Sequence, residues 1–109
     1  MSDLIDITKV IVNFRDERDW GQFHQPKDLA LAINIESSEL MEQFLWKTDN
    51  EANVHKVKEE LADVFAYCFL LAHHYEFDVK EIVLNKIEQN KLKYPIDKAK
   101  GSAKKYNEL

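Results

Sequence analysis

Apolar residues recur every three or four positions in the first part of the chain, the spacing that lines them up on one face of an α-helix. The residues that set this period are Leu4, Ile7, Val10, Ile11 and Phe14. Ser2 stands where it can cap the start of the helix, and the charged residues 15–19 follow the last apolar position. The pattern predicts a first helix that begins after Ser2 and closes within residues 15–19.

A second helical period begins after residues 20–25, which interrupt the first one. Pro26 has the place of a proline at the first position of a helix, and apolar residues then mark one face of a long helix. These residues are Leu29, Ile33, Leu40 and Phe44. We therefore expect a second helix from Pro26 to about Trp46, joined to the next element by residues 48–50.

The third predicted helix begins between Asn50 and Val54 and runs to about Tyr75. Its second half, residues 61–72, is apolar nearly all round except for Asp63. A helix that is apolar on every side is typical of a buried position. We therefore expect this helix to be central and covered on most sides by other helices.

A fourth helix is predicted between Asp78, which forms a variant of the capping box with Glu81, and Pro95, which stops the helix. The following residues 96–109 are rich in lysine, contain Gly101 and show no apolar period. We expect this last segment to be a mobile tail.

The residues that form turns are too few for a β-rich fold. The 109 residues include two glycines and two prolines, and none of these lies between Pro26 and Pro95, whereas a β-rich fold needs a turn about every 8–12 residues. The sequence predicts an all-α fold, with a domain like a four-helix bundle in residues 1–95, followed by the tail. Because a chain of this size buries only about 65% of its unfolded surface, we expect oligomerisation to complete the fold.

Charge and cysteine content narrow the range of partners and compartments. Fifteen Lys and Arg against twenty Asp and Glu give a net charge of −5, which argues against duplex nucleic acid or an anionic membrane as a partner. The longest uncharged apolar run, residues 64–72, is about half as long as the roughly 18 residues of a membrane span. The single Cys68 can form no internal disulfide, which favours a reducing, cytoplasmic location.

Two pairs of acidic residues stand at helical spacing among apolar positions. Glu36 and Glu39 share one face of the second predicted helix, and Glu60 and Asp63 share one face of the third. Asp63 lies in the most apolar segment, where a buried carboxylate needs a cation, a set of hydrogen-bond donors or a proton. If the two helices face each other, the four carboxylates converge.

Two interpretations of these carboxylates are open. In the first, Glu39 and Glu60 are solvated, and Glu36 and Asp63 pair with nearby Lys or Arg residues. In the second, the carboxylates hold a metal ion; ligands that are all oxygen suit Mg²⁺ or Mn²⁺, and the sequence lacks the Glu-x-x-His pairs of di-iron bundles. Mg²⁺ held by a few carboxylates binds substrate phosphates, so this interpretation indicates a phosphate ester or anhydride as the substrate.

Six segments between residues 14 and 95 carry a resemblance to a known family. They are Phe14 to Trp20, Phe23 to Lys27, Glu36 to Leu40, Phe44 to Lys47, Glu59 to Val64 and Asn90 to Pro95. Together they closely resemble the MazG-like superfamily of all-α nucleoside triphosphate pyrophosphohydrolases, especially its dCTP pyrophosphatase branch. One departure is Ile35, where many members of the wider superfamily have a further Glu, although the dCTP branch tends to be apolar at this position.

The resemblance implies a metal site and a reaction. By resemblance, the Mg²⁺ ligands would be Glu36, Glu39, Glu60 and Asp63, with Mn²⁺ as a possible substitute. Water would attack the α-phosphorus of dCTP or a related nucleoside triphosphate and release the monophosphate and pyrophosphate. Either Glu36 or Glu39 could also orient this water; we choose Glu39, since Glu36 is expected to be the more buried of the two.

The resemblance also implies residues that bind the substrate, and an assembly. The residues expected to contact the base are Trp20, His24, Trp46 and Tyr67. The residues expected to contact sugar or phosphate are Asn90, Lys91 and Lys93. Members of the family are homodimers or dimers of dimers with sites near subunit contacts, which implies a homodimer or homotetramer here as well.

Structural roles are the alternative for each of these residues. Trp46 and Tyr67 could be core residues, and Lys91 and Lys93 could be solvated lysines at the end of a helix. For the whole chain, the alternative function is a catalytically silent helical oligomerisation or nucleotide-binding module, in which the acidic pairs are structural.

Overall fold

A computed structural model describes residues 2–109, and all regular structure in this range is helical. The α-helices are α1 (Asp3–Glu17), α2 (Pro26–Glu42), α3 (Val54–His74), α4 (Val79–Lys93) and α5 (Ile96–Ala99). The 3₁₀ helices are η1 (Gly21–Phe23), η2 (Asp49–Glu51) and η3 (Tyr106–Glu108). The all-α prediction is confirmed.

The starts of the helices follow from local chemistry in the sequence. The Ser2 hydroxyl accepts a hydrogen bond from the Ile5 amide at 3.2 Å, and the Asp78 carboxylate accepts one from the Glu81 amide at 2.9 Å. Asn53 caps α3 in the same way, and Pro26 is the first residue of α2. Each side chain satisfies an amide that the first turn of its helix leaves unpaired, which is why these boundaries were predictable.

The end of α2 differs from the prediction. We expected the helix to reach Trp46, but it ends at Glu42. The amides of Phe44 and Leu45 bond three residues back, at 3.0 and 3.2 Å, so the chain tightens into turns. Trp46 then has a φ of 60°, in the left-handed region that a residue with a large side chain seldom adopts, and this ends any helical continuation.

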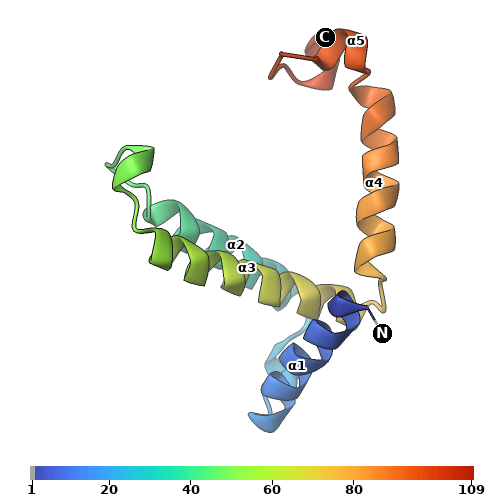
Figure 1. The fold of residues 1–109 in the computed structure, drawn as a ribbon. Helices are drawn as coiled ribbons and strands as arrows, with labels where there is room; N and C mark the ends of the chain where they lie inside the picture. The colour runs from blue at the N-terminus through green and yellow to red at the C-terminus, as the bar shows by residue number, and fades with distance from the viewer. Residues whose placement is uncertain (1) are drawn as a thin grey trace. The chain divides into compact units, whose positions relative to one another are not determined.

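The first compact unit, Met1–Glu76, contains α1, α2 and α3. Figure 1 shows α2 and α3 side by side as a helical hairpin, with α1 packed against α3. The buried apolar residues among residues 2–109 are Leu29, Leu70 and Ala72. This small core is centred where the start of α2 meets the C-terminal half of α3.

The expectation that other helices cover α3 on most sides is wrong for the single chain. Phe65 is 55% exposed and Leu61 is 41% exposed, although both lie in the apolar half of α3. Two helices, α1 and α2, make the main contacts with α3, and together they leave one flank of it uncovered. Helix α3 therefore has more apolar side chains than the core of a single chain buries.

The second compact unit, Phe77–Leu109, contains α4, α5 and η3. The chain turns after Pro95, and the Tyr106 ring packs edge-to-face on the Tyr94 ring, with 6.1 Å between the centroids. The predicted division after Pro95 falls inside this unit, and the mobility of residues 96–109 stays a prediction. Within residues 2–109, each helix is too short or too polar to cross a membrane.

Candidate active site

Carboxylates from α2 and α3 lie next to one another in the hairpin. One oxygen atom each from Glu36, Glu60 and Asp63 lies within 4.8 Å of the other two. Because α2 and α3 pack side by side, the faces that carry the two acidic pairs are brought together. These three residues could hold a metal ion, since a divalent cation takes several oxygen ligands at about 2.0–2.6 Å.

Glu39, the fourth carboxylate, interacts with members of both pairs. A hydrogen bond and charge repulsion from Glu36 raise the pKa of Glu39, although a hydrogen bond with Glu60 opposes this shift. Burial raises the pKa of Glu60, and Glu39 and Asp63 raise it further. In the metal-free protein Glu39 and Glu60 therefore hold protons more tightly than ordinary glutamates do.

The cluster has buried oxygen atoms that find no partner in the protein. Glu36 Oε2 and Glu60 Oε2 are both buried and without a hydrogen bond. The ion pairs of residues 2–109 include none of the four carboxylates. An unpaired buried carboxylate oxygen is costly, and a divalent cation is the group that would satisfy two such oxygens together. The donor set therefore fits a metal ion. Lys56 acts on Glu60 through its charge, which opposes the rise in the pKa of Glu60, without forming an ion pair with it.

Asp63 is more accessible than the sequence predicts. We expected it to be buried, but its side chain is exposed. It nevertheless stays within reach of Glu36 and Glu60 and lines the adjoining pocket. The buried carboxylate oxygens belong instead to Glu36 and Glu60, on the inner side of the hairpin.

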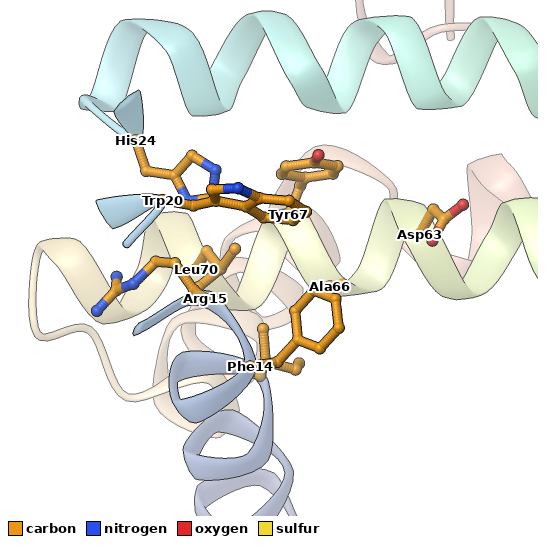
Figure 2. Close-up of a pocket in the computed structure, with 9 residues that line it drawn as sticks. Phe14, Arg15, Trp20, His24, Asp63, Ala66, Tyr67 and Leu70 are labelled. Carbon is orange, nitrogen blue, oxygen red and sulfur yellow. The ribbon is translucent and has the colours of Figure 1, made fainter. Parts of the chain in front are cut away.

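An apolar pocket adjoins the cluster along α3, and Asp63 belongs to both. The lining residues are Ile11, Phe14, Arg15, Trp20, His24, Asp63, Ala66, Tyr67 and Leu70. Figure 2 shows Trp20, His24 and Tyr67 gathered at one side of the pocket, with Asp63 one turn further along α3. Asp63 and Tyr67 are four residues apart, so the acidic and the aromatic groups occupy successive levels of one helix face.

The rings at this pocket are fixed by contacts with one another. His24 and Tyr67 meet edge-to-face with 6.1 Å between their centroids, and Trp20 meets Phe14 in the same way at 5.7 Å. The element η1 brings Trp20 and His24 to this position, between α1 and α2. The sequence predicted that Trp20, His24 and Tyr67 serve one site, and the structure brings these three together.

The surroundings of His24 and Tyr67 shift the pKa values of both side chains. Burial lowers the pKa of His24, nearby Arg15 lowers it further, and Asp28 opposes the shift. His24 Nδ1 is buried and has no hydrogen-bond partner. Burial raises the pKa of Tyr67, and the charges of Glu36 and Asp63 add to the effect. The imidazole is therefore held in its neutral form, with one nitrogen left available to a bound molecule.

Other predicted substrate contacts lie elsewhere in the chain. Trp46 is 93% exposed and does not line the pocket. Asn90, Lys91 and Lys93 belong to the second compact unit. There, Lys91 Nζ pairs with Glu88 Oε1 at 2.7 Å, and Lys93 Nζ lies 5.0 Å from the centroid of the Tyr106 ring.

Some residues that line the pocket were not predicted to belong to a site. Phe14 and Arg15 belong to a segment that carries the family resemblance, which was the signal available for them. Ile11 was assigned to the apolar period of the first helix, and that period gave no sign that this position faces a pocket.

Comparisons with known proteins agree with this geometry. A model of the MazG-like family matches residues 31–109. Human dCTP pyrophosphatase 1 is 41% identical over 114 residues, which is 97% of this chain and 67% of the human protein. The chain belongs to the MazG-like family. The mouse protein of the same name is 40% identical over the same shares of the two chains.

A solved structure extends the agreement to the fold. A pyrophosphatase from Archaeoglobus fulgidus has a TM-score of 0.80 and 35% identity, over 87% of this chain and 94% of the archaeal one. This MazG-like chain is a nucleotide pyrophosphatase, a hydrolase that acts on nucleoside triphosphates. The predictions of family and enzyme class are confirmed.

Proposed function

We propose that this MazG-like protein hydrolyses dCTP, or a related deoxynucleoside triphosphate, to the monophosphate and pyrophosphate in a reaction that needs Mg²⁺. The observation that carries the proposal is the acidic cluster, in which one oxygen each from Glu36, Glu60 and Asp63 lies within 4.8 Å of the other two. Glu36 and Glu60 each also have a buried oxygen without a hydrogen bond. The name of the mammalian relatives, dCTP pyrophosphatase 1, supports this choice of base and sugar.

The acidic residues would act together on the triphosphate. Glu36, Glu60 and Asp63, with Glu39 beside them, would hold the metal, with Mn²⁺ as a possible substitute for Mg²⁺. When bound, Mg²⁺ supplies charge that offsets the triphosphate and the departing pyrophosphate. Glu39 is our choice to orient the attacking water, because in this pair it is Glu36, and not Glu39, that has the buried oxygen without a hydrogen bond.

The apolar pocket would take the nucleoside. Trp20, His24 and Tyr67 offer ring faces and edges against which a base can stack. Because Tyr67 follows Asp63 by one turn of α3, a nucleotide with its base at the rings would extend its phosphates towards the acidic cluster. His24 Nδ1, buried and unpartnered, could accept a hydrogen bond from an amino group of the base.

The roles of the remaining predicted contacts are proposed from the family resemblance. We assign Asn90, Lys91 and Lys93 to the sugar and the phosphates, where lysine charge offsets the anionic substrate. The exposed apolar residues of α3 and the exposed Trp46 support assembly as a homodimer or homotetramer, in which Trp46 would reach the nucleoside pocket of another copy. The lone Cys68 supports a reducing, cytoplasmic compartment.

The test is an assay of products with dCTP and Mg²⁺. Attack at the α-phosphorus yields dCMP and pyrophosphate, and a reaction in ¹⁸O-labelled water puts the label in dCMP. Formation of dCDP and orthophosphate, or label in pyrophosphate, would contradict the proposed reaction. A silent module would show no turnover with any nucleoside triphosphate, and titration calorimetry would then find no coupled binding of Mg²⁺ and a non-hydrolysable analogue.

A further inference from the structure

The C-terminal segment folds back on the end of α4. Residues 96–109 contain α5 and η3, and the first residue of η3 is Tyr106. Its ring packs edge-to-face on Tyr94, with an interplanar angle of 83°, and lies under the ammonium group of Lys93 at 5.0 Å. Two side chains that are neighbours in sequence, Lys93 and Tyr94, are thus both held by one residue of the segment.

The two lysines in the last turn of α4 have different partners. Lys91 pairs with the carboxylate of Glu88 at 2.7 Å, so its charge is largely offset within the helix. Lys93 lies over a neutral aromatic ring, and the ion pairs of residues 2–109 do not include it. A ring attracts an ammonium group through its quadrupole but carries no net charge. The positive charge of Lys93 is therefore held in position and remains available to an anion.

Fixing this side chain matters because lysine loses much rotational freedom when it binds. Its four-carbon stem carries high rotamer entropy, and a contact that restricts it beforehand reduces the loss on binding. The second compact unit, Phe77–Leu109, has eight Lys against five Asp and Glu, so the lysine also lies in a region of net positive charge. Both features favour a polyanionic ligand over a neutral one.

We propose that Tyr106 is a positioning residue that orients Lys93 for the phosphates of the substrate, so that the C-terminal segment takes part in binding the triphosphate. The inference rests on the proposed function, in which Lys93 contacts the substrate phosphates. Tyr106 itself touches Lys93 and Tyr94 rather than substrate. Its ring, and not its hydroxyl, provides both contacts.

Steady-state kinetics with dCTP and Mg²⁺ test this role through four variants of the full-length protein. Tyr106→Ala should raise KM about 2- to 10-fold, the range expected when one long side chain has to be ordered on binding, with kcat unchanged. Tyr106→Phe keeps the ring and should retain the wild-type KM. Lys93→Ala should raise KM at least as much as Tyr106→Ala does. In the double variant the two effects should not add, because Tyr106 acts through Lys93.

A nuclear magnetic resonance measurement tests the contact without relying on activity. In the nucleotide-free protein with labelled lysine, the methylene protons next to the Lys93 ammonium should be shifted upfield by the Tyr106 ring. This shift should vanish in Tyr106→Ala and persist in Tyr106→Phe. Lys91, two residues earlier on the same helix and paired with Glu88, is an internal control whose signals should not move.

The outcomes separate this inference from the proposed function. If the wild-type protein turns over no nucleoside triphosphate, the proposed function fails. If the wild type is active and Tyr106→Ala has an unchanged KM, the inference is overturned while the proposed function stands. Additive effects in the double variant, or a raised KM in Tyr106→Phe equal to that of Tyr106→Ala, would also overturn it.

Discussion

The acidic cluster and the aromatic pocket lie on the same pair of helices, yet they are built in opposite ways. Glu36 and Glu60 keep buried oxygens without partners, and the groups around them raise the pKa values of Glu39 and Glu60. In the pocket, His24 Nδ1 is also buried without a partner, but it carries no charge, and the rings of His24 and Tyr67 support each other. The cluster is thus incomplete without a cation, whereas the rings of the pocket meet without a ligand.

This difference separates two kinds of contribution to the proposed reaction. Carboxylates that repel one another store unfavourable energy, which binding of a cation releases, so they couple stability to chemistry. Aromatic rings that already contact one another keep their positions without a ligand. When a base stacks on them, they add affinity for the nucleotide but discriminate little between bases. We therefore expect substitutions in the cluster to act on turnover, and substitutions in the pocket to act on affinity.

The largest expected effect is the loss of turnover when a carboxylate of the cluster is neutralised. Glu36→Gln and Asp63→Asn should each lower kcat by about 10²- to 10³-fold or more, because each removes a charged ligand from the proposed metal site, where the cation would stabilise the departing pyrophosphate. The measurement is dCMP release with Mg²⁺ at saturating dCTP.

A matched control is available on α3, next to Glu60. Glu59→Gln removes a carboxylate that pairs with His55 at 2.9 Å and does not belong to the cluster. This variant should keep its turnover. Equal losses in all three variants would mean that the total negative charge of the hairpin matters, and not the cluster.

The second effect is on thermal stability and has opposite signs with and without metal. In EDTA, Glu36→Gln and Asp63→Asn should be as stable as the wild type or more stable, since each removes repulsion. With Mg²⁺ at about 100 times its dissociation constant, the wild type should gain about 2.7 kcal/mol, and the variants much less. Thermal melts of the three proteins in both conditions give the comparison.

A structural role for the carboxylates predicts the reverse result. Neutralising one partner of a structural ion pair destabilises the fold whether or not metal is present. If the Mg²⁺-dependent shift in Tm is the same in the variants and the wild type, Glu36 and Asp63 do not belong to a metal site.

The third effect tests the pocket. Tyr67→Ala should remove stacking worth about 1–3 kcal/mol, seen mainly as a raised KM for dCTP.

Trp46→Ala should raise KM in the same way only if another copy of the chain brings Trp46 to the nucleoside, because its indole is 93% exposed in its own chain. Steady-state kinetics and tryptophan fluorescence on binding a dCTP analogue measure both variants. An unchanged KM and spectrum in Trp46→Ala would remove this residue from the site.

The sequence predicted the features that depend on neighbouring residues. Ser2 and Asp78 cap their helices through amides three residues away, so the local sequence contains the whole interaction. The spacing of Glu36, Glu39, Glu60 and Asp63 likewise follows from helical geometry. That the two pairs meet depends on the packing of α2 against α3, which the helical spacing within each helix does not determine and the structure shows.

The predictions that failed concern features that the local sequence does not determine. The apolar spacing continues through Phe44, so the sequence carried no sign that α2 ends at Glu42 and turns at Trp46 without a glycine. Asp63 was expected to be buried because its neighbours are apolar, but exposure depends on which flank of α3 other elements cover. The contact of Tyr106 with Lys93 joins residues that no periodic pattern relates.

The smallest effect we expect is a pH dependence of stability in the metal-free protein. Because the folded-state pKa values of Glu39 and Glu60 are raised, the folded protein binds more protons than the unfolded chain between the ordinary glutamate pKa and the raised values. Their contribution to the free energy of unfolding is therefore fully present at low pH and is lost as the pH rises through the raised values.

Urea unfolding in EDTA at a series of pH values measures this contribution. Because other carboxylates also titrate, the Glu39→Gln variant is the reference. The stability of the wild type relative to this variant should fall as the pH rises through that range and then level off. Mg²⁺ should abolish the fall, since a bound cation favours the charged carboxylates. A stability difference that is independent of pH in EDTA would mean that Glu39 is solvated, and the contrast between a strained cluster and a relaxed pocket would then have to be abandoned.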